Sequence, residues 1–208
     1  ARAMSSGDAL GPHSYATFLL PGAMTLVAVF ASIFSSIAVI EERNQGWLQS
    51  VLVAPVPRWS IALGKIGGGA AVAFVQAVVL LLALPVLGAT MTVTGVATSV
   101  LALALTCLGV SSLGFVFAWR SETTAGFHAV MNLVFVPLWM LSGAFFPVDA
   151  ASPWLAWLAR ADPLTWCTAA IREPLAGAAS WGSLAATAGF AAVMFGWAVR
   201  VVARPRRP

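Results

Sequence analysis

The fold is decided by residues 66–119, whose sequence is IGGGAAVAFVQAVVLLLALPVLGATMTVTGVATSVLALALTCLGVSSLGFVFAW and which contain no charged side chain. A helix rises about 1.5 Å per residue, so one helix of this length would far exceed a hydrocarbon core of about 30 Å. Pro85 and Gly88 interrupt the run near its middle. We therefore predict two membrane-spanning helices, over 66–87 and 95–118, joined by a tight turn.

Three further stretches have the length and composition of membrane spans. They cover residues 18–40, 127–146 and 181–203, and each stops close to charged residues or proline. In lipid every backbone polar group must be hydrogen-bonded within the protein, so such spans should be helices. A β-barrel would need many alternating segments of about ten residues, and none is visible. The sequence predicts an all-α polytopic membrane protein with five transmembrane helices in a single domain, residues 1–208.

The composition excludes a soluble enzyme and a nucleic-acid-binding protein. Hydrophobic residues make up 60% of the chain and charged residues only 9%, whereas a soluble domain has about 25% charged residues. The net charge is +4, but the basic residues are sparse and stand at the ends of apolar runs, as topology signals do. Two histidines and two scattered cysteines offer no spacing typical of a metal site.

The distribution of Lys and Arg predicts the orientation. Connections on one side hold eight basic residues: Arg43, Arg58, Lys65, Arg120, Arg200, Arg204, Arg206 and Arg207. Connections on the other side hold three: Arg2, Arg160 and Arg172. The positive-inside rule places the first set and the C-terminus in the cytoplasm. Five spans with an external start lead us to expect a sixth span upstream in the full protein.

The predicted cytoplasmic loop, residues 41–65, contains a short amphipathic helix. Four apolar residues gather on one side of it: Trp47, Leu48, Val51 and Leu52. The helix should stop at Ala54, because Pro55 disfavours helical geometry in the residue before it. Its apolar face either lies on the bilayer surface or docks on a soluble partner.

The predicted external loop, residues 148–180, contains two short helices. Ser152-Pro153 and Asp162-Pro163 each look like an N-cap followed by proline at the first helical position. The first helix carries Trp154 and Trp157 on one face, and tryptophan often marks the headgroup level. The second helix should run from Pro163 to Arg172 and end before Pro174. We expect both to lie at or dip into the outer leaflet, with anchoring as their simplest role.

Four residues within the spans are candidates for a translocation path. Gln76 and Asn132 are polar groups inside spans, where such residues either act in transport or form interhelical hydrogen bonds. Phe135 and Trp139 could line an apolar path, although packing or lipid contact explains them as well.

Two motifs resemble the type-2 ABC transporter permeases, a bacterial and archaeal exporter family. The loop motif E-R-x-x-G-x-L-x-x-x-L-x-x-P-x-x-R is formed by Glu42, Arg43, Gly46, Leu48, Leu52, Pro55 and Arg58, with Gly64-Lys65 following. The external motifs resemble the segment between the family's fifth and sixth spans: Ser142-Gly143, Phe145-Phe146-Pro147, Pro153-Trp154 and Asp162-Pro163-Leu164-Thr165.

The resemblance implies a coupling helix over 44–54 that docks in a groove of a separate ABC ATPase. Glu42 and Arg43 would be polar contacts at its entrance. Two permease copies, identical or not, would export a lipophilic drug or a lipid- or glycan-linked molecule across a bacterial or archaeal cell membrane. ATP and Mg would be bound by the partner, because this chain has no phosphate-binding loop: Gly64-Lys65 is followed by Ile66. The chain itself is then a transport subunit with no cofactor and no catalytic residue.

Three alternatives stay open at this point. An ion-coupled secondary transporter would favour paired carboxylates within spans, and the predicted spans contain no Asp or Glu. A membrane anchor without transport activity is the second alternative. An intramembrane serine protease is the remotest, since it rests on Ser111 and His128 alone, and serine in a transmembrane helix usually bonds its own backbone.

Overall fold

The computed structural model describes residues 12–46, 57–85, 92–144, 152–178 and 181–203. Every regular element among them is an α-helix, which confirms the predicted fold class. The helices are α1 (Pro12–Asn44), α3 (Arg58–Leu81), α4 (Val93–Arg120), α5 (Thr124–Leu141), α6 (Pro153–Ala161), α7 (Pro163–Leu175) and α8 (Trp181–Ala203). Five of these, α1, α3, α4, α5 and α8, are long and apolar enough to cross a membrane.

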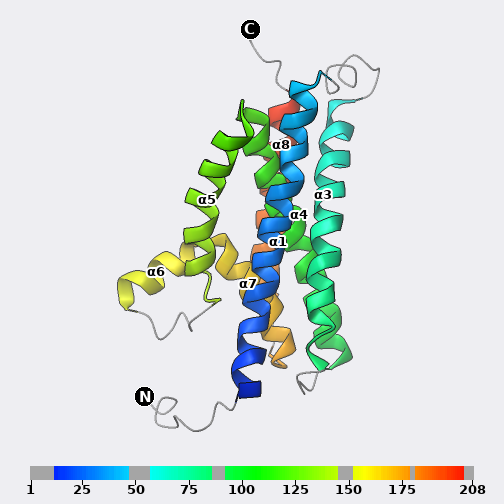
Figure 1. The fold of residues 1–208 in the computed structure, drawn as a ribbon. Helices are drawn as coiled ribbons and strands as arrows, with labels where there is room; N and C mark the ends of the chain where they lie inside the picture. Colours follow the sequence, from blue (N-terminus) through cyan, green and yellow to red (C-terminus); the bar gives the residue numbers. More distant parts are fainter. Residues whose placement is uncertain (1–11, 47–56, 86–91, 145–151, 179–180, 204–208) are drawn as a thin grey trace.

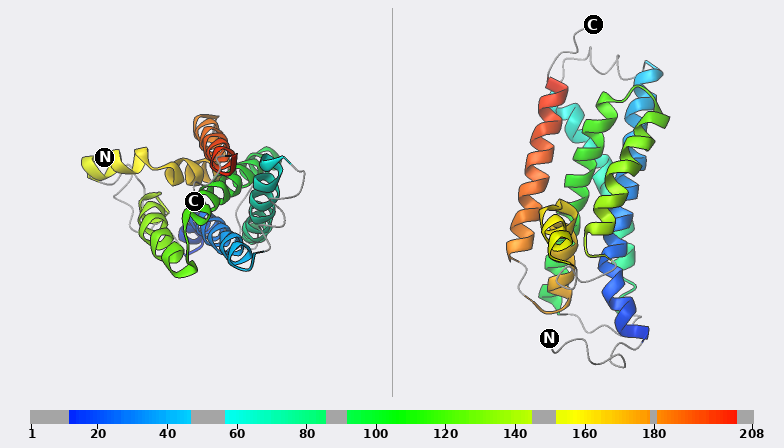
Figure 2. Two further views of the ribbon diagram at one scale, coloured as in Figure 1. Left: turned by 90° about the horizontal axis from the view of Figure 1, so that it is seen from above. Right: turned by 90° about the vertical axis from the view of Figure 1, so that its left-hand side faces the viewer.

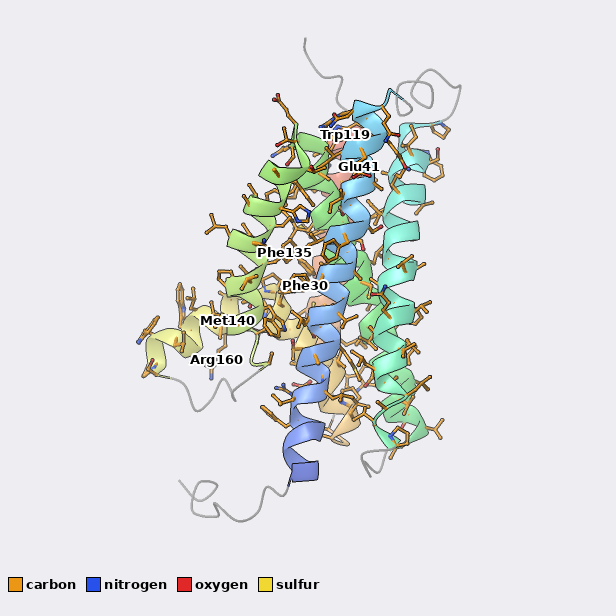
Figure 3. All side chains as sticks on the ribbon, in the orientation of Figure 1. Phe30, Glu41, Trp119, Phe135, Met140 and Arg160 are labelled. Carbon is orange, nitrogen blue, oxygen red and sulfur yellow. The ribbon has the colours of Figure 1, made fainter. Side chains whose placement is uncertain are left out.

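The five long helices run side by side, with α1 and α4 between the others (Figures 1 and 2). The ends of α1, α4 and α8 and the start of α3 lie together at one end of the bundle, at the top of Figure 1. These stretches carry Arg43, Lys65, Arg120 and Arg200. We call this the basic end. Figure 3 shows Glu41 and Trp119 at the same end. Toward the opposite end, α6 projects sideways from the bundle and α7 runs along the long helices.

Small and hydroxylated residues allow α1, α3 and α4 to approach closely. Ser111 of α4 donates a hydrogen bond to Ser32 of α1 over 2.9 Å. A Cβ on Gly69 of α3 would lie 2.6 Å from the Ser35 hydroxyl, and a Cβ on Gly114 of α4 would lie 2.7 Å from the Ser36 hydroxyl. In lipid, contacts between small side chains replace the hydrophobic effect as the source of helix association.

The helices extend beyond two of the predicted spans at the basic end. α1 continues to Asn44, and α3 begins at Arg58 instead of residue 66, so the predicted 41–65 connection shrinks to residues 45–57. The reason is that the charged residues at these ends have partners: Glu42 pairs with Lys65. Pro57 precedes the first residue of α3 in extended geometry, and proline fits the start of a helix.

Two spans are shorter than predicted at the opposite end. α3 ends at Leu81 instead of residue 87, and α5 ends at Leu141 instead of residue 146. Gly143 has a φ of +72°, a left-handed conformation that glycine adopts at low cost and that commonly follows the end of a helix. α5 therefore ends at Leu141, ahead of the turn at Gly143.

The second helix of the predicted external loop is longer and more buried than predicted. α7 continues through Pro174 to Leu175, because proline near a helix end removes only one backbone hydrogen bond. Gly177, with a φ of +75°, then closes the helix. Cys167 and Ile171 are fully buried, and Ser99 of α4 donates a hydrogen bond to the Ile171 carbonyl over 2.9 Å. α7 is therefore an integral part of the bundle.

We predict that Gly95→Ala destabilises the protein by about 1–3 kcal/mol, the usual cost of overpacking. A Cβ at Gly95 would lie 2.4 Å from the Pro174 carbonyl oxygen, so the backbones of α4 and α7 would have to separate. The free energy of unfolding in detergent micelles measures the effect. Gly189→Ala is the matched control, because a Cβ there meets nothing within 4 Å. Equal stabilities of the two variants would contradict the close packing of α7.

Candidate functional site

Five of the nine predicted coupling residues lie outside the described part of the chain. These are Trp47, Leu48, Val51, Leu52 and Pro55. Glu42, Arg43 and Gly46 are described, and Arg58 is the first residue of α3. The site can therefore be built from the two ends of the loop, where it leaves α1 and where it enters α3.

Glu42 of α1 forms an ion pair with Lys65 of α3. Both side chains are 26% exposed, so water screens the pair only in part, and its contribution to stability lies near the upper end of about 0–1 kcal/mol. The pair joins α1, which precedes the loop, to α3, which follows it. Sequence analysis placed Lys65 in the motif but did not identify it as the partner of Glu42.

Arg43 connects the same end of α1 to α4. Its Nη1 donates to the Trp119 carbonyl over 3.0 Å, and its Nη2 donates to the Ser121 carbonyl. The last carbonyls of a helix have no partner within the helix and carry partial negative charge. A guanidinium group satisfies two of them at once. No sequence signal pointed to this pairing, because 76 residues separate Arg43 from Trp119.

Gly46 ends α1 in a left-handed turn. Its φ is +79°, and its N–H donates to the Arg43 carbonyl over 3.1 Å. A side chain here would meet no neighbour within 4 Å, so the backbone conformation, and not space, explains the glycine. Together, Glu42, Arg43 and Gly46 fix the direction in which the chain enters residues 47–56.

The four predicted path residues do not form one site within a single chain. Gln76 lies exposed on α3 and Asn132 lies exposed on α5, and these helices flank α1 on either side (Figure 2). Phe135 is 1% exposed in the main apolar core. The Trp139 indole N–H donates to the Gly22 carbonyl over 3.1 Å. Phe135 and Trp139 therefore pack α5 against its neighbours.

The external residues have distinct environments. Trp154 and Trp157 of α6 are 69% and 73% exposed, so this helix presents an aromatic face that the described residues do not cover. Pro163 is the first residue of α7, and Asp162 caps that helix by accepting the Leu164 N–H over 2.9 Å. The other oxygen of Asp162 is buried without a partner among the described residues. Burial raises the pKa of Asp162 to about 7, although the Leu164 hydrogen bond opposes the shift.

Asp162 should make stability depend on pH. Because its pKa is higher in the folded protein than the ordinary value of 3.8, ionisation disfavours the folded state. We predict that the wild type loses up to about 4 kcal/mol between pH 4 and pH 7, at about 1.4 kcal/mol per unit of pKa difference. The free energy of unfolding is measured as a function of pH for the wild type and for Asp162→Asn, which keeps a capping oxygen. The difference between the two gives the pH dependence due to Asp162. Identical pH profiles would show that the carboxyl is not desolvated.

The part of the chain that the structure describes contains no group of three or more His, Cys, Asp or Glu residues able to hold a metal ion. Arg172 of α7 is a partly buried cation, and its local contacts were not predicted from the sequence. It was counted only as a topology charge, and no motif in its vicinity indicated contacts with α1 and with the residues that follow α5.

Comparison with known proteins agrees with the helical bundle. Residues 6–175 match the ABC-2 type transporter family. A relative from Cyanophora paradoxa, named "Putative transport permease ycf38", is 28% identical over 162 residues, which cover 77% of this chain and 56% of the relative. The chain thus spans little more than half of that protein's length. No solved structure matches the chain significantly. The family match covers most of the chain and confirms the resemblance seen in the sequence: this multi-pass membrane protein belongs to the ABC-2 type transporter family.

Proposed function

We propose that the chain is the permease subunit of an ATP-driven exporter, and that the segment between α1 and α3 docks on an ABC ATPase. Family membership implies such a partner in general terms. The observation that carries the proposal is the bracing of both loop ends: Glu42 binds Lys65, and Arg43 binds the end of α4. A loop that only connected α1 to α3 would not require the end of α1 to be held to α4 as well.

The bracing suggests how movement would pass from the ATPase to the membrane. A force on residues 47–56 would be transmitted through Glu42 and Lys65 to α1 and α3, and through Arg43 to α4. These three helices are closely packed, so they would move together. ATP and Mg bound by the partner would thereby shift the bundle between two states, which is how transporters commonly couple energy to access.

The proposed orientation places the basic end and the C-terminus in the cytoplasm. Lys and Arg near span ends favour the cytoplasmic side, and the helix ends that carry Arg43, Lys65, Arg120 and Arg200 lie together at one end of the bundle. The ATPase would then meet the loop in the compartment that supplies ATP, and transport would be directed outward across a bacterial or archaeal cell membrane.

We further propose that α5 packs against a second permease copy and that the substrate passes between the copies. Asn132 is exposed on α5 between Val130 and Leu133, which are 39% and 78% exposed. An amide facing hydrocarbon is unfavourable, so polar residues in spans usually face protein or a water-filled cavity. A path at this interface would be lined largely by apolar side chains. That favours a lipophilic drug or a lipid- or glycan-linked substrate.

The docking proposal predicts that Leu52→Asp abolishes binding of the ATPase. A carboxylate on the apolar face of the amphipathic segment would have to be buried without a partner, at a cost of several kcal/mol. The measurement is copurification of the ATPase with the full-length protein from its native membranes. Gln49→Asp is the matched control, since position 49 lies off the apolar face. Normal copurification with Leu52→Asp would exclude docking through this segment.

The dimer proposal predicts that Asn132→Cys forms a disulfide-linked dimer in a background lacking Cys107 and Cys167. In a two-fold symmetric interface each residue near the axis meets its own copy. Oxidation of native membranes followed by non-reducing electrophoresis gives the dimer fraction. Val193→Cys, on an exposed part of α8, is the control. Equal cross-linking at the two positions would show random collision and would exclude α5 as the interface.

A further inference from the structure

Arg172 is a largely buried cation that has no carboxylate partner among the described residues. Its Nη2 donates to the Gly143 carbonyl over 2.9 Å and makes a longer contact of 3.4 Å with the Phe18 carbonyl. Its guanidinium also lies 4.3 Å from the centre of the Phe18 ring. Its Nε is buried without an acceptor in the described chain, and burial lowers its pKa. Its partners among the described residues are all neutral.

These contacts bring together three segments that are distant in sequence. Arg172 lies on α7, Phe18 lies on α1, and Gly143 belongs to the turn that follows α5. The left-handed conformation of Gly143 forms part of the turn whose carbonyl the guanidinium group binds. One side chain therefore holds the outer end of α5 in place relative to both α1 and α7.

A close contact between α1 and the turn that follows α5 also holds the end of α5 in place. A Cβ on Gly22 of α1 would lie 2.6 Å from the Ala144 Cβ and 2.7 Å from its Cα, so the α5 turn rests directly on α1. The Trp139 indole, one turn earlier, donates to the Gly22 carbonyl. We call Phe18, Gly22, Gly143, Ala144 and Arg172 the outer clamp.

The rest of α5 is held much less firmly. Only Phe127, Met131 and Phe135 are buried along the helix, and Leu138 and Trp139 pack partly against the same core. The opposite side of the helix faces away from the bundle, with Leu133 78% exposed and Met140 53% exposed. A helix attached by one narrow apolar stripe can tilt if its end is released. The outer clamp is the fixed point that determines the position of α5.

The chemistry of the clamp suits a contact that breaks and re-forms. A buried ion pair is strongly destabilised when one partner leaves, by about 3–5 kcal/mol, because a charge is left uncompensated. Hydrogen bonds to carbonyls and a cation–π contact are individually weaker, about 0.5–3 kcal/mol each. An arginine whose described contacts are all with neutral groups can therefore exchange them for water or lipid headgroups at a moderate cost.

We propose that the outer clamp is the external closure of the exporter, and that Arg172 is the positioning residue that keeps it shut in the resting state. The closure opens when α5 and its turn separate from α1 and α7. This inference rests on the proposed function, because ATP hydrolysis by the partner would open the closure. The contact in the resting state can be tested without ATP.

The test measures how fast a buried reporter thiol becomes accessible. Ser142→Cys places a thiol of similar size at a position that is 2% exposed, directly before Gly143. The full-length protein is reconstituted in nanodiscs and labelled with a membrane-impermeant maleimide. Cys107 and Cys167, both buried, stay in place as internal indicators of an intact fold.

We expect Arg172→Met to raise the labelling rate at position 142 by about tenfold or more, which corresponds to about 1.4 kcal/mol. Arg172→Lys should give a smaller rise, because an ammonium group can still reach the Gly143 carbonyl. Arg160→Met, at an exposed arginine on α6, should have no effect. Equal rates for Arg172→Met and Arg160→Met, with Cys107 protected, would overturn the proposal.

If Arg172→Met also exposes Cys107, Gly22→Ala decides the question, because it opens the clamp sterically without removing a charge. A higher labelling rate at position 142 alone supports the closure, and an unchanged rate contradicts it.

Adding the ATPase and ATP separates this inference from the proposed function. If ATP accelerates labelling of the wild-type background but Arg172→Met does not accelerate it, the ATP-driven function is supported and closure by the outer clamp is contradicted. If Arg172→Met accelerates labelling and ATP does not, closure by the outer clamp is supported and the ATP-driven function is contradicted.

Discussion

The close packing of α1 against α3 and α4 is the contact on which the rest of the structure depends. In lipid no hydrophobic effect draws helices together, so they associate through small side chains and hydroxyl contacts. Ser32 with Ser111, Gly69 with Ser35, and Gly114 with Ser36 provide these contacts. Since α1 and α4 lie between the other helices, they act as a rigid centre. α5, which shares little of this packing, is the element most free to move.

The two ends of α1 are fixed by different chemistry. At the basic end, the ion pair of Glu42 with Lys65 ties α1 to α3, and Arg43 also binds the end of α4. At the opposite end, the described contacts of Arg172 are with carbonyls and an aromatic ring, and no ion pair accompanies them among the described residues. The end with the ion pair suits the transmission of force, and the end without one suits release. A movement that begins in the loop could therefore pass along a stiff α1 and end in separation of the α5 turn.

The sequence predicted the elements better than their ends or their long-range contacts. Charge-free runs of sufficient length indicated all five long helices, and the Asp162-Pro163 pattern indicated the start of α7. Helix ends were misplaced where a distant partner compensates a charge, as Lys65 does for Glu42, or where Gly143 turns the chain. The burial of α7 was missed because the helix is too short to span a membrane and carries Arg172 and Glu173, charges that suggested a segment at the membrane surface. The contacts of Arg43 and Arg172 could not be predicted, since their acceptors are backbone carbonyls, which carry no sequence signal.

The central claim is that residues 45–57 form the contact with an ATPase and that the braced helix ends convey its movement. Amide hydrogen exchange of the full-length protein, measured with and without the ATPase, tests this claim most directly. We expect slower exchange in residues 45–57 on addition of the ATPase, with a further ATP-dependent change at the ends of α1 and α4 around Arg43 and Trp119. Exchange that is unchanged in residues 45–57, under conditions where the ATPase is bound, would contradict this claim.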